Sequence, residues 1–172
     1  MILDLDKVST GSERIEGREV VGFRDAAGDE NRIDCHVELS VRRNGETYYI
    51  EINLTGTFST ACHRCLESTR FELNPSFGLV VQRSVARGEP EGPAADGDFI
   101  RLPAGQTELS LDPYIYENLI VNIPMQICCG EGCRGLCSGC GRNLNREECV
   151  CDGPADSRWD ALRKLTDLED SS

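Results

Sequence analysis

The stretch that decides the fold runs from Arg32 to Ser59 and reads RIDCHVELSVRRNGETYYIEINLTGTFS. Apolar and polar side chains alternate strictly over its first ten residues, as expected for a β-strand with one buried face. The Asn44-Gly45 pair that follows is the preferred centre of a two-residue type I′ hairpin turn. Alternation resumes at Tyr48, and Gly56 predicts a bulge or a close backbone approach in the return strand. The stretch therefore predicts an antiparallel hairpin.

A third alternating run, Thr69 to Gln82, follows the sequence Cys62-His63-Arg64-Cys65, and Pro75 within it indicates an edge position or a bend. The three runs together predict an antiparallel meander with the Cys62–Cys65 pair at its second turn. Upstream, two short strands are expected around residues 2–5 and 19–23. The residues expected to face the core of the hairpin are its alternating apolar ones: Ile33, Cys35, Val37, Leu39, Val41, Tyr48, Ile50, Ile52, Leu54 and Phe58.

The chain beyond the meander mixes a loop with short elements. Residues 84–98 (SVARGEPEGPAADGD) have no periodicity and are rich in glycine, proline and acids, so we expect a flexible acidic insertion. Residues 99–111 suit one further strand. Asp112 and Pro113 have the residue types of a helix N-cap and a first helical position, which predicts a short helix over 112–121. The apolar positions expected on the buried sides of this helix and of a last helix over 156–169 are Ile115, Leu119, Trp159, Leu162, Leu165 and Leu168.

The expected fold class is α+β. It comprises an antiparallel β-meander, as a small twisted or barrel-like sheet, with a short helix, a Cys-rich zinc-knuckle-like segment and a C-terminal helix. We expect a mainly antiparallel β domain over residues 1–127, and a metal-binding segment with its helix packed on it over residues 128–172.

Charge and cysteine usage restrict the partners and the compartment. The net charge is −12 at pH 7, which makes the surface a poor non-specific ligand for nucleic acid or an anionic membrane and favours basic partners. The opening MILDLDKVST has no signal-peptide pattern, and no apolar run approaches a membrane span. We therefore expect a cytoplasmic protein, in which ten cysteines are better suited to metal binding than to disulfides.

Seven of the ten cysteines lie in CCGEGCRGLCSGCGRNLNREECVC, residues 128–151. The Cys137-x2-Cys140 and Cys149-x-Cys151 pairs supply four thiolates for a local, closed zinc site. Upstream, Cys133 with either Cys128 or Cys129 leaves two ligands that need partners, and the Cys62–Cys65 pair is available. The prediction is one or two structural zinc ions held by two ligand sets: Cys62, Cys65, Cys129, Cys133 and Cys137, Cys140, Cys149, Cys151.

Other interpretations of these residues stay open. The cysteines can be buried small hydrophobes, as expected for Cys35, or the Cys62–Cys65 pair can be a redox dithiol. No GxSxG, P-loop or HExxH motif occurs, and all-cysteine zinc sites are closed, so we expect no enzymatic activity. Basic residues at the cysteine turns either contact RNA or a partner, or only neutralise thiolate charge: His63, Arg64, Arg134, Arg142 and Arg146.

Four stretches carry a family resemblance: CHRCLE, LSLDPYIYENLIVNIPM, the 128–151 cluster and the terminal DSRWDALRKL. In this order they resemble the YceD-like family of bacterial and plastid proteins, described as large ribosomal RNA subunit accumulation proteins. The family pattern matches Cys62, Cys65 and the C-x3-C-x-GLC-x2-CG-x-NLN run, and it favours Cys129 over Cys128 as the ligand. The resemblance implies a non-enzymatic ribosome-biogenesis factor acting on 23S rRNA or the large subunit, with basic ribosomal proteins as further partners. The alternatives are a stand-alone zinc-dependent nucleic-acid-binding module and a thiol-redox or metal-sensing protein.

Overall fold

The computed structural model describes residues 1–9, 11–24, 28, 30–83, 92–93, 99–103 and 105–151. The chain divides into two compact units: Met1–Thr60 with Thr69–Ile127, and Ala61–Ser68 with Cys128–Ser172. Among the described residues, no helix combines the length and the apolar character needed to cross a membrane. The predicted insertion over 84–98, apart from the backbone of residues 92–93, and the predicted helix over 156–169 lie outside the described residues.

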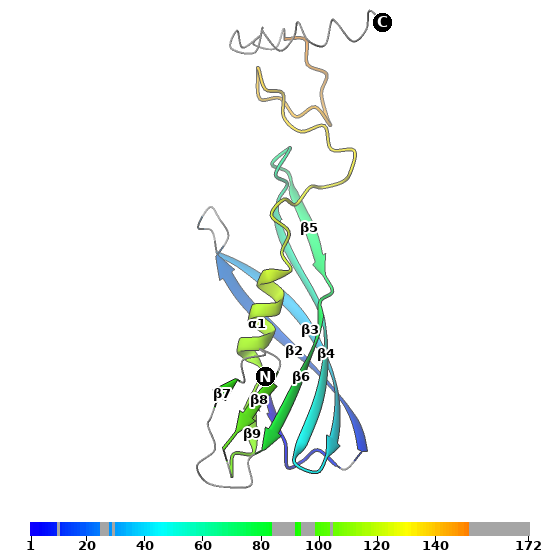
Figure 1. The fold of residues 1–172 in the computed structure, drawn as a ribbon. Helices are drawn as coiled ribbons and strands as arrows, with labels where there is room; N and C mark the ends of the chain where they lie inside the picture. The colour runs from blue at the N-terminus through cyan, green and yellow to red at the C-terminus, as the bar shows by residue number, and fades with distance from the viewer. Residues whose placement is uncertain are drawn as a thin grey trace, which may run out of the picture. The chain divides into compact units, whose positions relative to one another are not determined.

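The first unit is built on a seven-stranded sheet with the strand order β2-β3-β4-β6-β8-β7, and β5 pairs with β4 beside this path (Figure 1). Its strands are β2 (Gly11–Arg24), β3 (Glu30–Asn44), β4 (Thr47–Ala61), β5 (Ser68–Leu73), β6 (Ser76–Arg83), β7 (Gly92–Pro93) and β8 (Phe99–Leu102). A second, two-stranded sheet pairs β1 (Ile2–Asp4) with β9 (Glu108–Ser110), and the helix α1 spans Asp112–Val121. The predicted mainly antiparallel sheet with a short helix is confirmed. The sheet is mixed, because β6 and β8 run parallel.

The central hairpin forms as predicted, but its turn differs. β3 and β4 pair without a bulge from Asp34↔Thr57 to Asn44↔Thr47, so the turn residues are Gly45 and Glu46. Gly45 has φ +61°, whereas Glu46 is not among the residues with positive φ. The predicted type I′ turn centred on Asn44-Gly45 is therefore wrong. Glycine at the first central position is the pattern of a type II′ turn, and Asn44 keeps its place in the ladder.

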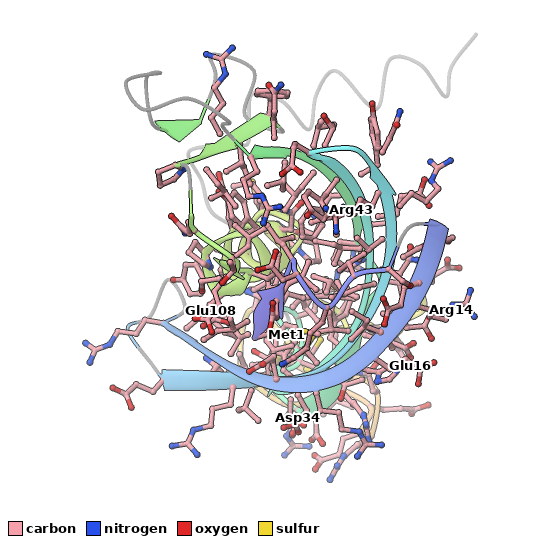
Figure 2. The ribbon with its side chains drawn as sticks, turned by 90° about the horizontal axis from the view of Figure 1, so that it is seen from below. Met1, Arg14, Glu16, Asp34, Arg43 and Glu108 are labelled. Atoms are coloured by element: carbon pink, nitrogen blue, oxygen red, sulfur yellow. The ribbon has the colours of Figure 1, made fainter. Side chains whose placement is uncertain are left out.

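Strand β2 is much longer than the expected strand over residues 19–23. It pairs with β3 continuously from Gly11↔Arg43 to Arg24↔Glu30. The apolar pattern predicts a shorter strand because charged residues interrupt it. Of these, Arg14 and Glu16 lie on the outer, solvated side of the curved sheet (Figure 2). β2 ends the sheet on one side, where a charged edge strand is a common protection against unwanted pairing.

The core of the first unit lies between the concave face of the sheet and α1. Strands β2, β3, β4 and β6 curve around the helix (Figure 2) but do not close into a barrel. Ile115 and Leu119 of α1 are buried, as predicted, and so are all ten apolar positions expected for the hairpin. Pro75 separates β5 from β6, which confirms the predicted bend. Asp112 is the first helical residue and not the N-cap; Leu111 occupies that position without a side-chain cap.

At Gly56 the helix side chain Leu119 packs closely against the sheet. A Cβ atom added there would lie 2.8 Å from Ile33 Cγ2 and 3.3 Å from Leu119 Cδ2, so the close approach is confirmed and the bulge is absent. We expect Gly56→Ala to lower the free energy of unfolding by about 1–3 kcal/mol through overpacking, measured by urea denaturation. Gly22→Ala is the control, because its Cβ would meet nothing within 4 Å. Equal urea midpoints for the two variants would contradict this packing.

Candidate metal centres

The first centre gathers four cysteines from two distant stretches of the chain. The Sγ atoms of Cys62, Cys65, Cys129 and Cys133 all lie within 4.8 Å of one another. Cys62 Sγ is 3.8 Å from Cys133 Sγ, and Cys65 Sγ is 3.6 Å from Cys129 Sγ. Cys129 is exposed, while the other three are buried. Cys128 packs against this group without entering it.

The second centre is local in sequence and more open to solvent. Its four sulfurs, from Cys137, Cys140, Cys149 and Cys151, also lie within 4.8 Å of one another. The Sγ–Sγ distances are 3.3 Å for Cys137–Cys151, 3.4 Å for Cys140–Cys149 and 2.8 Å for Cys149–Cys151. Cys140 and Cys151 are exposed, and Cys137 and Cys149 are half-buried. The structure thus brings together both predicted ligand sets.

Both sets have the chemistry of a structural zinc site. A tetrahedral zinc with Zn–S bonds of about 2.3 Å has S–S edges of about 3.8 Å, which the two distances in the first centre closely match. The sulfurs of the second centre lie somewhat closer together, so an ion there would spread them by a few tenths of an ångström or more. Four thiolates complete the coordination of zinc and leave no open position for substrate.

Each centre is built on a Cys-x2-Cys turn, and the two turns share one backbone geometry. In the first, the N–H of Cys62 donates to Glu67 O (2.8 Å) and that of Leu66 donates to Cys62 O (2.9 Å). In the second, the N–H of Cys137 donates to Arg142 O (2.7 Å) and that of Gly141 donates to Cys137 O (2.9 Å). The equivalent residues Leu66 and Gly141 both have positive φ, +61° and +73°. Leucine in this left-handed conformation costs about 1–2 kcal/mol. The other interactions of the metal turn therefore hold Leu66 in a conformation that leucine itself disfavours.

Backbone amides point at one sulfur in each turn and favour its thiolate form. The N–H of Arg64 lies 3.4 Å from Cys62 Sγ, and the N–H of Gly139 lies 3.4 Å from Cys137 Sγ. Hydrogen bonds from the backbone of Cys65, and then of Arg64 and Cys129, lower the pKa of Cys62 to about 5. Those from the backbone of Cys140 and Gly139 lower the pKa of Cys137 to about 6.

Other sulfurs resist ionisation, although in the first centre the hydrogen bond from the Asn145 side chain lowers the pKa of Cys133. The neighbouring Cys133 sulfur, followed by that of Cys65, raises the pKa of Cys129 to about 12. The Cys149 sulfur, followed by that of Cys137, raises the pKa of Cys151 to about 12. Each centre therefore carries only part of its possible thiolate charge without a metal, and binding of a divalent cation would release the remaining thiol protons.

The five basic residues predicted to contact RNA or a partner all belong to the second unit. Three of the arginines have partners inside it: Arg64 Nη1 donates to Cys133 O (3.3 Å), Arg146 pairs with Glu67 (2.5 Å) and Arg142 with Glu147 (3.7 Å). The Arg134 side chain and His63 are exposed. The arrangement is a mixed-charge surface, and not a concentrated basic patch.

Sequence reasoning missed three residues that support the centres. Glu67 Oε1 accepts a hydrogen bond from Asn143 Nδ2 (3.1 Å), and Asn145 Nδ2 donates to Cys133 Sγ (3.4 Å). The Asn143-Leu144-Asn145 sequence contains no cysteine, so cysteine spacing does not point to it. Its signal was the residue type, since asparagine side chains in turns bond readily to nearby backbone and side chains.

Cys35, as expected, is a buried core residue, and burial raises its pKa to about 11.

Comparison with known proteins places these features in a family. The model of the family described as "Large ribosomal RNA subunit accumulation protein YceD" matches residues 50–166. A chloroplastic YCED homolog 1 of Zea mays is 23% identical over 76% of this chain and 53% of its own length. The Arabidopsis thaliana homolog is 22% identical over 67% of this chain and 43% of its own, so the chain spans about half of each relative.

No solved structure matches the chain. The family match covers more than half of the chain and includes all eight cysteines of the two centres. On this basis, the chain belongs to the YceD family of large ribosomal RNA subunit accumulation proteins.

Proposed function

We propose that this chain is a non-enzymatic ribosome-biogenesis factor that supports accumulation of 23S rRNA, and that both of its cysteine centres hold structural zinc. The observation that carries the proposal is the family match over a region that contains two closed four-sulfur centres. The family name links it to large-subunit rRNA, and the centres supply a rigid binding surface. Function in the cytoplasm, where thiols stay reduced, suits eight thiolate ligands.

Zinc would act here as a cross-link. In the first centre it would join residues 62–65 to residues 129–133, and in the second it would join residues 137–140 to residues 149–151. Each ion would fix turns that have little apolar area to bury, because the buried cluster in the described part of the second unit consists of cysteines. The four-thiolate sets leave no coordination position for a reacting water or substrate, which supports a non-enzymatic role.

The charge of the second unit favours a protein partner over bare RNA. Residues 61–68 and 128–151 contain four arginines and four glutamates, and a zinc ion bound by four thiolates leaves about two negative charges at each centre. Together with the net charge of −12, this surface repels phosphate and attracts cations. A basic ribosomal protein of the large-subunit assembly intermediate is therefore the proposed direct contact.

Depletion of the protein in its own organism tests the proposal. Sucrose-gradient profiles should show a reduced large-subunit peak and a lower ratio of 23S to 16S rRNA, restored by the wild-type chain. A normal large-subunit peak would contradict the role. Binding to purified assembly intermediates should survive nuclease treatment of accessible RNA. Binding that instead weakens steeply with salt and requires naked rRNA would favour a nucleic-acid-binding module.

A further inference from the structure

The turn Asn143-Leu144-Asn145 contributes no sulfur, but it contacts the first centre and directly follows Arg142, which closes the second metal turn. Asn145 Nδ2 donates to Cys133 Sγ of the first centre at 3.4 Å, and Asn145 Oδ1 accepts the N–H of Arg134 at 2.8 Å. Asn143 Oδ1 in turn accepts the N–H of Asn145 at 3.0 Å and its Nδ2 at 2.9 Å. The two side-chain amides therefore hold one another in place beside a ligand sulfur.

The same turn is joined to the Cys62–Cys65 loop. Asn143 Nδ2 donates to Glu67 Oε1 at 3.1 Å, and Arg146, which follows the turn, pairs with the other oxygen of Glu67 at 2.5 Å. Glu67 also supplies the carbonyl that receives the N–H of Cys62 in the first metal turn, at 2.8 Å. Movement of Asn143 is thereby transmitted to the backbone that shapes the first centre.

The backbone on the other side of the turn belongs to the second centre. Arg142, immediately before Asn143, accepts the N–H of Cys137 at 2.7 Å and so closes the second metal turn. The N–H of Leu144 donates to Gly135 O at 2.9 Å, and Leu136 pairs with Asn143 in an isolated β-bridge. Leu136 N–H also reaches Arg64 O of the first loop, at 3.0 Å. Residues 135–136 are thus bonded both to the first metal turn and to the asparagine turn that follows the second.

Gly135 makes this junction possible. Its φ is +74°, and a Cβ atom there would stand 3.1 Å from Arg64 O. Glycine accepts both the backbone conformation and the close contact, so the two loops meet through backbone atoms without an intervening side chain.

We propose that Asn143 and Asn145 are positioning residues that couple the two zinc centres, so that an ion in the first strengthens binding of an ion in the second. This rests on the zinc assigned under the proposed function. With the first centre full, Cys133 and Glu67 are fixed, and they hold the asparagine turn, which fixes Arg142 and the second metal turn. The coupling is reciprocal, as any coupling of binding free energies must be.

The coupling is tested by measuring the zinc affinity of the second centre when the first centre is full and when it is empty. Native mass spectrometry of the full chain in zinc-buffered solutions counts species with no, one and two ions. The buried first centre should fill first, so the second step in wild type reports the second centre beside a full one. The double variant Cys62→Ser, Cys65→Ser reports the same centre beside an empty one. We expect binding to be about tenfold or more weaker in the double variant, within the usual range of about 5–150-fold.

The matched variants are Asn145→Ala and Glu148→Gln. Asn145→Ala should reduce the ratio of the two affinities towards one, because it removes the contact with Cys133 and with the backbone of Arg134. Glu148→Gln changes an exposed residue of the same segment and should leave the ratio unchanged. A ratio of one in wild type, or an unchanged ratio in Asn145→Ala, would overturn the coupling.

One further comparison applies if the double variant is unstable. If the double cysteine variant does not fold, Asn145→Ala is compared with wild type in the chain that keeps all eight ligands. Asn145 contacts no sulfur of the second centre within the described residues, so a loss of about tenfold in second-centre affinity would support coupling and unchanged affinity would overturn it. A chain that binds no zinc at all would overturn the zinc assignment as well, whereas two ions bound independently would overturn the coupling alone.

Discussion

Replacing Cys65 with serine is expected to reduce the zinc content from about two ions per chain to about one. Cys65 is 4% exposed, and its sulfur is one of four that would close the first centre. Structural zinc binding is worth about 10–16 kcal/mol in zinc-finger peptides, so three remaining thiolates should hold the ion far more weakly. Metal analysis of protein purified under reducing conditions and passed over a chelating resin measures the loss.

Cys128→Ser is the matched control for this substitution. Cys128 is adjacent to the ligand Cys129 and packs against the same buried cysteines, but it lies outside the four-sulfur set. It should keep about two ions, and its thermal unfolding should resemble that of wild type. Loss of an ion in Cys128→Ser with retention in Cys65→Ser would show that the ligands of the first centre are misassigned.

The effect of Cys65→Ser should be confined to the second unit. The first unit has its own apolar core, which runs from the strands of the main sheet to α1. Its cooperative unfolding, followed by circular dichroism at the β-sheet minimum, should therefore change by less than about 1 kcal/mol. A loss of the sheet signal at the same denaturant concentration as the loss of zinc would contradict this independence.

The sequence predicted the central hairpin well because one physical requirement dominates it. Alternation from Ile33 to Val41 and again from Tyr48 leaves only one face that can be buried, so strand register and core follow together. The same argument fails for β2, whose inward positions include Glu13, Gly17 and Glu19. Such a strand is specified by its pairing with β3, and that pairing leaves no alternating apolar pattern in β2 itself. The parallel β6–β8 pair was missed for the same reason.

The sequence likewise predicted one part of the metal centres and missed another. Cysteine spacing was sufficient to predict the two ligand sets that the structure brings together, because close pairs of thiols at turns are rarely used otherwise. Spacing carries no information about Glu67, Asn143 or Asn145, which act through side-chain hydrogen bonds between loops. It also could not show that Leu66 takes the conformation that Gly141 has in the second turn.

Acidification is expected to empty the second centre before the first. Zinc binds thiolates, so every thiol that holds a proton in the metal-free protein must release it on binding. At pH 7 these include Cys129 and Cys151, whose pKa values are raised to about 12, together with Cys65 and Cys149, whose pKa values are also raised. At least about two protons are therefore released per ion, and each centre should lose at least about 100-fold in affinity per pH unit below 7.

The order of release follows from the thiols whose pKa values are lowered, which are Cys62 and Cys133 in the first centre and Cys137 in the second. A thiol with a lowered pKa stays ionised until the pH falls through that lowered value. Above this pH the thiol releases no proton when zinc binds; below it, one more proton must be released, and the zinc affinity falls more steeply. Without the shift, this change would occur near the ordinary pKa of 9.0. The lowered pKa is about 6 for Cys137 in the second centre and about 5 for Cys62 in the first. As the pH falls, the zinc affinity of the second centre should therefore begin to decline more steeply about one pH unit above the point at which the affinity of the first centre does.

Metal analysis after rapid desalting at a series of pH values measures this order. We expect about two ions per chain at pH 7.5 and two steps of loss as the pH falls, the second centre losing its ion at the higher pH. Cys65→Ser, which should keep only the second centre, should lose its ion no later than the first of these two steps. Burial acts in the same direction, because protons and competing ligands reach the exposed Cys140 and Cys151 more easily than the buried Cys62 and Cys65. Retention of the second ion after loss of the first would contradict both the lowered pKa of Cys62 and the protection that burial gives to the first centre.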